Sequence, residues 1–165
     1  MVLSDGAIIE GLGTGQIGIS PYPKSEAIQP ASVDLRLSDD FRTIGGNLFE
    51  PGDFPLKPTS FVLGSTIEQV TVPNNMVARV EGKSSLARMG ILVHVTAGFI
   101  DPGFSGRITL EFANLSTEVF NLVRGMYICQ ISFETLDRPA LRPYGSEGLG
   151  SSYQNQTGTR ESKYA

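Results

Sequence analysis

In the segment RITLEFA (107–113), residues 107–112 alternate between polar and apolar side chains without a break. Successive side chains of a strand point to opposite faces, so Ile108, Leu110 and Phe112 share one face and Glu111 lies on the other. This pattern predicts a sheet that buries one face in a core and leaves the other open to solvent or a ligand.

Other parts of the chain also favour extended structure. The strand-rich segments span residues 32–37, 61–72, 76–82, 91–97 and 127–136. Nineteen glycines and ten prolines can supply tight turns between them. Helix signals are few: Ser4 or Asp5 can cap a short helix that runs through Glu10 and ends near Gly11. The sequence predicts a mainly β fold, either a barrel or a two-sheet roll.

Length and composition exclude several classes of protein. A chain of 165 residues, 40% of them hydrophobic, can bury its own core as one domain spanning residues 1–165. The net charge of −4 argues against a protein that coats nucleic acid. No window approaches the ~20 apolar residues of a membrane span, and MVLSDGAIIEG at the start lacks the features of a signal peptide. The single cysteine, Cys129, excludes an intrachain disulfide, which suits the cytoplasm.

Two segments partly match nucleotide-binding motifs but lack the surrounding residues that these motifs need. GTGQIG (13–18) matches the dinucleotide fingerprint, but that motif needs a helix after it, and Pro21 and Pro23 follow here. EGKSS (81–85) contains the Gly-Lys-Ser of a P-loop, but Val77 stands where the motif needs glycine. A turn is therefore expected at the first motif, and no P-loop at the second.

SSLARMG (84–90) can form one or two helical turns, with Ser84 near the N-cap and Gly90 at the stop. Ser84 and Arg88 then share one face. Free N–H groups at the helix start, beside Lys83 and Arg88, would suit a phosphate. A solvated turn without a ligand is the alternative.

Zinc is not expected, because the chain has one histidine, His94, and one cysteine, and lacks the H-x-E and P-C-x-x-C ligands of zinc deaminases. His94 lies in an apolar segment and is predicted to be a hydrogen-bonded structural residue. Cys129 is predicted to lie in the core.

Two carboxylates remain. DPGF (101–104) predicts a turn that begins at Asp101. Glu111 lies in mid-strand among apolar neighbours, where a carboxylate destabilises the fold unless it is paired or exposed. It lies either on a solvent-open face or in a cleft, where it could transfer protons.

Together these segments resemble the dCTP deaminase family, within the trimeric dUTPase superfamily. The resemblance covers most of the chain and is carried above all by EGKSSLARMGILVHVTAGFIDPGFSGRITLEF (81–112). Further matching segments are MVLSDGAI, IQPASVDLRLSDDF, FVLGSTIE, RPYG and YQNQTG. It implies a distorted, jelly-roll-like β-barrel with few helices, assembled as a homotrimer with active sites between subunits. It also implies a Mg²⁺-bound deoxynucleoside triphosphate substrate and no zinc.

The resemblance implies catalytic roles as well. Glu111 is the expected glutamate that activates water for attack on cytosine C4 and passes a proton to the leaving ammonia. Ser84 and Arg88 would support that water, and the Ala97 backbone would hold the water and the base. Asp101 would contact the sugar.

The remaining expected positions bind substrate. The segment 83–88 of a neighbouring subunit would line the phosphates. Besides Ser84 and Arg88, it contains Lys83, Ser85, Leu86 and Ala87. Thr109 and Leu110 would recognise the base. Tyr144 and Gln156 would contact phosphate as part of a C-terminal lid, residues 145–165, whose Gly/Ser-rich composition otherwise predicts a mobile tail.

The chain departs from the family pattern in three places. Ser152 replaces a lysine that usually touches phosphate, and Lys163 lies too far along the chain to be expected to replace it. Cys129 stands where glycine is common, and the segment 42–58 is short.

One branch of the family converts dCTP to dUTP only, whereas another also releases pyrophosphate and forms dUMP for thymidylate synthesis. Gly98 and Phe99 follow Thr96-Ala97 here as in the bifunctional branch, so we expect dUMP as the product. Formation of dUTP only, dUTPase activity only, and a non-catalytic regulatory barrel are the alternatives. Inhibition by dTTP occurs in the family, and the sequence leaves it open here.

Overall fold

The computed structural model describes residues 1–164, so Ala165, the last residue of the predicted lid, lies outside the described residues. The helices are α1 (Asp5–Gly13), the short 3-10 helix η1 (Ser25–Ala27) and α2 (Ser84–Ala87). The strands are β1 (Gly18–Ser20), β2 (Ile28–Gln29), β3 (Ser32–Arg36), β4 (Phe54–Leu56), β5 (Phe61–Thr71), β6 (Met76–Gly82), β7 (Ile91–Val93), β8 (Phe99–Ile100), β9 (Ser105–Asn114), β10 (Phe120–Leu122) and β11 (Tyr127–Thr135). None of the described helices is long and apolar enough to cross a membrane.

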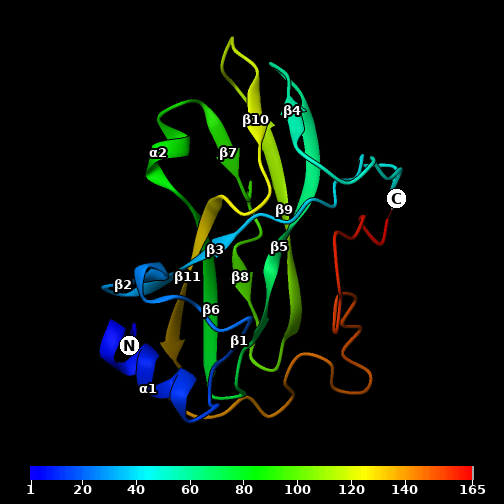
Figure 1. Ribbon diagram of the computed structural model, residues 1–165. Helices are drawn as coiled ribbons and strands as arrows, with labels where there is room; N and C mark the ends of the chain where they lie inside the picture. The colour runs from blue at the N-terminus through cyan, green and yellow to red at the C-terminus, as the bar shows by residue number, and fades with distance from the viewer. Residues whose placement is uncertain (165) are drawn as a thin grey trace.

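The strands form three antiparallel sheets, which Figure 1 shows as an elongated β structure with the helices at its periphery. The largest sheet has the order β2-β3-β11-β6-β8, the second has the order β1-β5-β9-β7, and β10 pairs with β4. The predicted mainly β fold is confirmed. Within residues 1–164 the three sheets do not join into one closed hydrogen-bonded barrel.

Strand β9 has the alternation that the sequence predicts. Ile108, Leu110 and Phe112 are at most 5% exposed, whereas Thr109 and Glu111 stay partly exposed. The buried face joins a single apolar cluster that includes residues of both large sheets. Each such side chain stabilises the fold by roughly 1.5–3 kcal/mol, so burial of this face fixes which side of β9 turns outward.

The pairing of β5 with β9 sets the frame of the site. Leu63 lies opposite Glu111, and Gly64 follows it in β5. A Cβ on Gly64 would lie 2.9 Å from Cε2 of Phe112 and 3.1 Å from Cε1 of Phe41. Glycine at this position therefore allows both aromatic rings to pack directly against β5.

Helix α1 ends at Gly13, two residues beyond the predicted stop. Gly11 lies inside the helix and faces Ile17, whose Cδ1 would be 2.9 Å from an added Cβ. The glycine thus serves close packing and does not end the helix. Ser4 is the N-cap residue but makes no side-chain capping hydrogen bond. GTGQIG connects α1 to β1, as expected for a turn.

Two strand predictions also need correction. β7 ends at Val93 because His94 has a φ of 67°, in the left-handed region that interrupts a strand. In β3, Asp34 is buried although the pattern placed it on a polar face, because its Oδ2 lies 2.5 Å from Nζ of Lys83. The pairing offsets part of the cost of burying that carboxylate, whose Oδ1 is buried without a hydrogen-bond partner.

Candidate active site

A cleft of about 670 Å³ opens between the outer face of β9, the segment 94–101 and the C-terminal tail. It brings together six of the predicted site residues: Ala97, Asp101, Thr109, Glu111, Tyr144 and Gln156. Apolar side chains, among them Phe61, Leu63 and Phe104, form much of the remaining wall. The cleft thus offers an apolar surface for a flat ring and convergent polar groups beside it, the usual composition of a small-molecule site.

Glu111 reaches the cleft because the outer face of β9 is not covered by another sheet. Its side chain is 27% exposed, and Oε2 lies 3.0 Å from Nδ1 of His94. Neither atom makes a well-directed hydrogen bond, so the two groups lie in close contact without an ideal hydrogen-bond geometry. The sequence left open whether Glu111 lies on a solvent-open face or in a cleft. Both are true, because the solvent-open face of β9 forms one wall of the cleft.

His94 is placed against Glu111 by the backbone as well. Its N–H donates to the carbonyl oxygen of Glu111 over 2.9 Å, and its side chain is only 5% exposed. Burial lowers the pKa of His94, but contact with Glu111 and its negative charge raise it by more, with smaller contributions from the Ala97 backbone and Glu81. The pKa of His94 therefore lies above its ordinary value. The sequence predicted a structural histidine and missed its place beside the central carboxylate.

Asp101 follows β8 and begins the predicted turn. Its carbonyl oxygen accepts the N–H of Phe104 over 3.2 Å, and Gly103 has a φ of 87° that favours glycine. The turn packs against the start of the tail, where the Tyr144 N–H donates to the carbonyl oxygen of Pro102 over 2.7 Å. The turn therefore places Asp101 and Tyr144 at the same end of the cleft.

The described part of the tail is docked on the body of the protein, whereas its composition predicted a mobile segment; the docking leaves its mobility as a prediction. Its backbone pairs with the start of β9: the Arg107 N–H donates to the Gln156 carbonyl oxygen over 2.9 Å. The Gln156 side chain donates through Nε2 to the Arg107 carbonyl oxygen, while its buried Oε1 has no hydrogen-bond partner. Gln156 thus lines the cleft with its amide group already bound to the strand.

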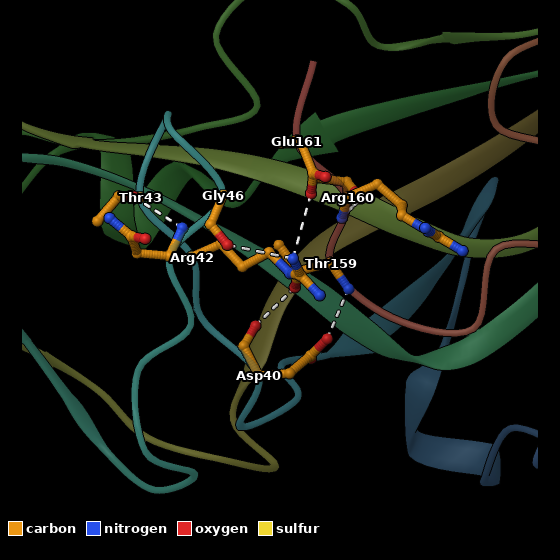
Figure 2. Close-up of polar contacts among 9 residues, drawn as sticks. Asp40, Arg42, Thr43, Gly46, Thr159, Arg160 and Glu161 are labelled. Carbon is orange, nitrogen blue, oxygen red and sulfur yellow. Dashed lines mark hydrogen bonds and ion pairs between the residues drawn. The ribbon is translucent and has the colours of Figure 1, made fainter. Parts of the chain in front are cut away.

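The end of the tail crosses the loop after β3, as Figure 2 shows. The Thr159 N–H donates to Oδ2 of Asp40, and Oε2 of Glu161 lies 3.2 Å from Nη1 of Arg42. Between them, the Arg160 N–H donates to Oγ1 of Thr109 over 3.1 Å. Sequence reasoning missed these contacts, because the partners are separated by 51 to 119 positions and no local pattern links them.

Helix α2 does not reach the cleft of its own chain and lies on the opposite side of the molecule from the tail in Figure 1. The exposed residues of this segment are Ser84, Ser85, Ala87 and Arg88. The N-cap position belongs to Lys83, and Ser84, which was expected near the N-cap, is the first helical residue.

Three expected substrate contacts are not supported by their side chains. Leu86 and Leu110 are buried in the apolar core, so only their backbone atoms could contact a ligand. The Lys83 ammonium is bound to Asp34 and is not directed to the cleft. A strand pattern alone cannot reveal this, because β3 and Lys83 meet only in the folded sheet.

The arrangement can place a carboxylate and a histidine on one side of a bound ring and the tail on the other. Glu111, in contact with His94, can accept a proton from water and return it to a leaving group. Asp101 lies where it could contact a second part of the ligand. Among residues 1–164, no group of three or more His, Cys, Asp or Glu is arranged to hold a metal ion.

Comparison with known proteins gives a consistent result. Residues 47–136 match the family model described as dCTP deaminase-like. The chain is 44% identical to a dUMP-forming dCTP deaminase of Nocardioides sp. and 45% identical to one of Thermobifida fusca, covering 99% of this chain and 95% and 92% of those proteins.

Solved structures show the same fold at lower identity. A 2′-deoxycytidine 5′-triphosphate deaminase from Agrobacterium tumefaciens matches with a TM-score of 0.69 and 23% identity, over 81% of this chain and 47% of that one. A native EIAV dUTPase matches with a TM-score of 0.55 and 22% identity, over 81% of this chain and 99% of that one.

Proposed function

The chain belongs to the dCTP deaminase-like family, and from this premise we propose that it converts dCTP to dUMP, ammonia and pyrophosphate. The observation that carries the proposal is the meeting of Glu111 and Asp101 in one cleft beneath the docked tail. Two hydrolytic steps are required: water replaces the amino group at C4 of cytosine, and a second water cleaves the bond between the α- and β-phosphates.

In the first step Glu111 is the general base and general acid. It takes a proton from the attacking water and delivers a proton to the leaving amino group, which departs as ammonia. The neighbouring His94 keeps the Glu111 side chain in place, because its Nδ1 lies 3.0 Å from Oε2 of the carboxylate. Such a general acid–base residue contributes roughly 10²–10⁴ in rate. The Ala97 backbone and Thr109 would orient water and base.

In the second step Asp101 is the candidate that contacts the sugar and directs the hydrolytic water. Asp101, Glu111 and Glu161 all line the cleft, so a triphosphate would be repelled by three carboxylates unless a divalent cation on its own oxygens reduced the repulsion. Mg²⁺, which prefers oxygen ligands, would be held by the triphosphate and enter with it, without a direct protein ligand, and would withdraw negative charge from the phosphates. Tyr144 and Gln156 would lie beside the phosphates.

We infer that a second copy of the chain completes the cleft with α2, in a homotrimer. Arg88 is exposed and makes no ion pair within residues 1–164. Met89, Leu92 and Phe99 are exposed apolar side chains nearby in the chain, of the kind that subunit contacts bury. Ser84, Ser85 and Arg88 would then reach the substrate of a neighbouring subunit.

Three further points belong to the proposal. The chain acts as one domain, with residues 145–165 as its lid. It works in the cytoplasm, where its substrates are made. Because dTTP is also a pyrimidine deoxynucleoside triphosphate, it would compete for the same cleft and inhibit.

The test is product analysis with dCTP and dUTP as separate substrates, each with Mg²⁺. Ammonia and pyrophosphate released together from dCTP support the proposal. Accumulation of dUTP from dCTP would assign the chain to deamination alone, and hydrolysis of dUTP without any attack on dCTP would assign it to dUTPase activity.

A further inference from the structure

The positive charge of the cleft comes from the last few residues of the described chain. Among the cleft-lining residues within 1–164, Arg160 and Lys163 carry permanent positive charges, whereas Asp101, Glu111 and Glu161 carry negative charges. A polyphosphate needs cationic donors close to its oxygens. Among the described residues that line the cleft, the permanently charged donors all lie in the segment of residues 159–163, which we name the C-terminal strap.

The strap is fastened to the body at Asp40. The Thr159 N–H donates to Oδ2 of Asp40 over 2.5 Å, and Oγ1 of Thr159 donates to the Asp40 carbonyl oxygen over 2.6 Å. Thr159 is only 2% exposed. Gly158 permits this approach, because a Cβ there would lie 2.6 Å from Oδ2 of Asp40. The attachment is therefore a specific one, built from the side chain and one backbone group of each of the two residues.

A second attachment lies two residues further along. Nη1 of Arg42 contacts both Oε2 of Glu161 and the carbonyl oxygen of Gly46, each at 3.2 Å (Figure 2). Gly46 has a φ of 79°, which turns its carbonyl oxygen within reach of the same guanidinium group. Arg42 and Glu161 are both partly buried, so water weakens their attraction less than it would on an open surface.

Arg160 lies between the two attachments in the chain, but its side chain takes part in neither of them. Figure 2 shows its side chain extending away from Asp40 and Arg42. Its backbone N–H binds Oγ1 of Thr109, on the same face of β9 as Glu111, and the residue lines the cleft. No hydrogen bond or ion pair engages its guanidinium group within residues 1–164. An unengaged guanidinium at the wall of the cleft is free to bind an anion.

The attachment at Asp40 is linked through β5 to β9, the strand that carries Glu111. Oγ of Ser65 donates to Oδ1 of Asp40 over 2.6 Å, and Ser65 pairs across β5 and β9 with Thr109. Burial raises the pKa of Asp40, but the hydrogen bonds from Ser65 and Thr159 outweigh burial and hold the pKa below its ordinary value. Asp40 therefore stays ionised and keeps both acceptors available at neutral pH.

We propose that Arg160 and Lys163 bind the polyphosphate of the substrate, and that Asp40 and Arg42 are positioning residues that hold the strap in place for this purpose. The proposal rests on the proposed function, because it assigns the polyphosphate to that same cleft. Lys163 lines a small adjoining pocket together with Ser152, so the cation missing at position 152 is restored by a residue eleven positions later.

The first experiment compares ligands that differ in phosphate number. Calorimetry would measure the binding of dCTP, dCMP and inorganic tripolyphosphate to the full chain and to its Arg160→Gln and Lys163→Gln variants. We expect each variant to bind dCTP and tripolyphosphate about tenfold more weakly, equivalent to about 1.4 kcal/mol, with dCMP affected less. Arg138→Gln, which removes an exposed arginine paired with Asp137, is the matched control.

Equal dCTP affinity in the variants and the wild type would overturn the proposal, as would an equal loss for dCMP and dCTP. A rise in activity would also overturn it, because the strap would then be an obstruction of the cleft. Failure of the proposed function is seen separately, as a wild-type chain that releases neither ammonia nor pyrophosphate from dCTP. Tripolyphosphate binding still tests the strap in that case.

The second experiment addresses positioning. Asp40→Asn and Thr159→Val should raise KM for dCTP about tenfold with a smaller change in kcat, and hydrogen exchange at the Arg160 amide should accelerate. The Tm shows whether the fold itself is retained. Unchanged KM together with faster exchange would overturn the positioning role, because the strap would then be released without consequence for the substrate.

Discussion

Nδ1 of His94 lies 3.0 Å from Oε2 of Glu111, and the His94 N–H donates to the Glu111 carbonyl oxygen over 2.9 Å. The two residues therefore meet through both backbone and side chain. The left-handed backbone of His94, with a φ of 67°, accompanies this double contact and ends β7 beside it. As a result, the protonation state of the histidine and the charge of the carboxylate depend on each other.

This coupling predicts the titration of His94. In the wild type its pKa lies above the ordinary value because Glu111 outweighs burial. Glu111→Gln removes the charge but leaves the burial, so the pKa of His94 should fall in that variant. His94 is the only histidine of the chain, so its ring resonances can be followed by NMR without assignment. An unchanged titration midpoint would mean that the contact is not made in solution.

Stability should also depend on pH through His94. Its folded pKa is raised above the unfolded value of about 6.5, so the stabilisation is fully present below about pH 6.5 and is lost as pH rises through the folded pKa. Urea unfolding from pH 5 to 9 would measure this decline. His94→Asn, a residue that tolerates the left-handed region, should remove this part of the pH dependence. The same slope in that variant would contradict the prediction.

Glu111→Gln should abolish deamination, with a loss of roughly 10²–10⁴ or more in kcat, while dCTP binding is retained. The amide keeps the size of the side chain but cannot take up the proton of water. Ammonia release and calorimetric binding would be measured on the same sample. Glu118→Gln, at an exposed position, is the matched control and should turn over dCTP normally.

The part of the site that lies within one strand or one turn could be predicted from the sequence. The alternation in β9 placed Glu111 opposite the core face, and the Asp-Pro-Gly-Phe segment gave the turn at Asp101. Both rest on local geometry: the period of two in a strand and the fixed φ of proline.

The rest depends on contacts between distant segments. Asp40 and Thr159 are 119 positions apart, and neither stands in a pattern that indicates the other. Lys83 was expected at a phosphate, but the register of the five-stranded sheet brings its ammonium to Asp34. The composition of the tail indicated mobility and could not show where the tail lies, because composition does not report the backbone pairing of Gln156 with Arg107.

The Lys83–Asp34 pair supplies a test of that correction. Lys83→Met leaves a buried carboxylate without its partner, and should cost about 3–5 kcal/mol of unfolding free energy. Adding Asp34→Asn should recover much of the loss, because the buried charge is removed. Lys24→Met, in an exposed pair with Glu26, should change stability by less than about 1 kcal/mol.

Denaturant unfolding would measure all of these Lys83 and Asp34 variants. If Lys83→Met folds as stably as the wild type but binds dCTP more weakly, then the phosphate role implied by the family resemblance is correct. The structural assignment would then be wrong.

A cleft shared between subunits predicts complementation between two inactive variants. Glu111→Gln lacks the proton-transfer group, and Arg88→Gln lacks the exposed arginine of α2 that would serve a neighbour. In mixed trimers formed by co-expression with two different tags, a site is intact when one subunit supplies Glu111 and another supplies Arg88. In an equal mixture, half of the subunits have an intact Glu111, and half have an intact Arg88. About a quarter of the sites therefore have both residues, so about a quarter of wild-type ammonia release should return.

Each variant alone must be inactive and must have the oligomeric state of the wild type by light scattering. If both residues served the same chain, every subunit of the mixture would carry one defect and no activity would return. Recovery of activity therefore requires α2 to act across the interface, which explains why the exposed Arg88 has no role in the cleft of its own chain.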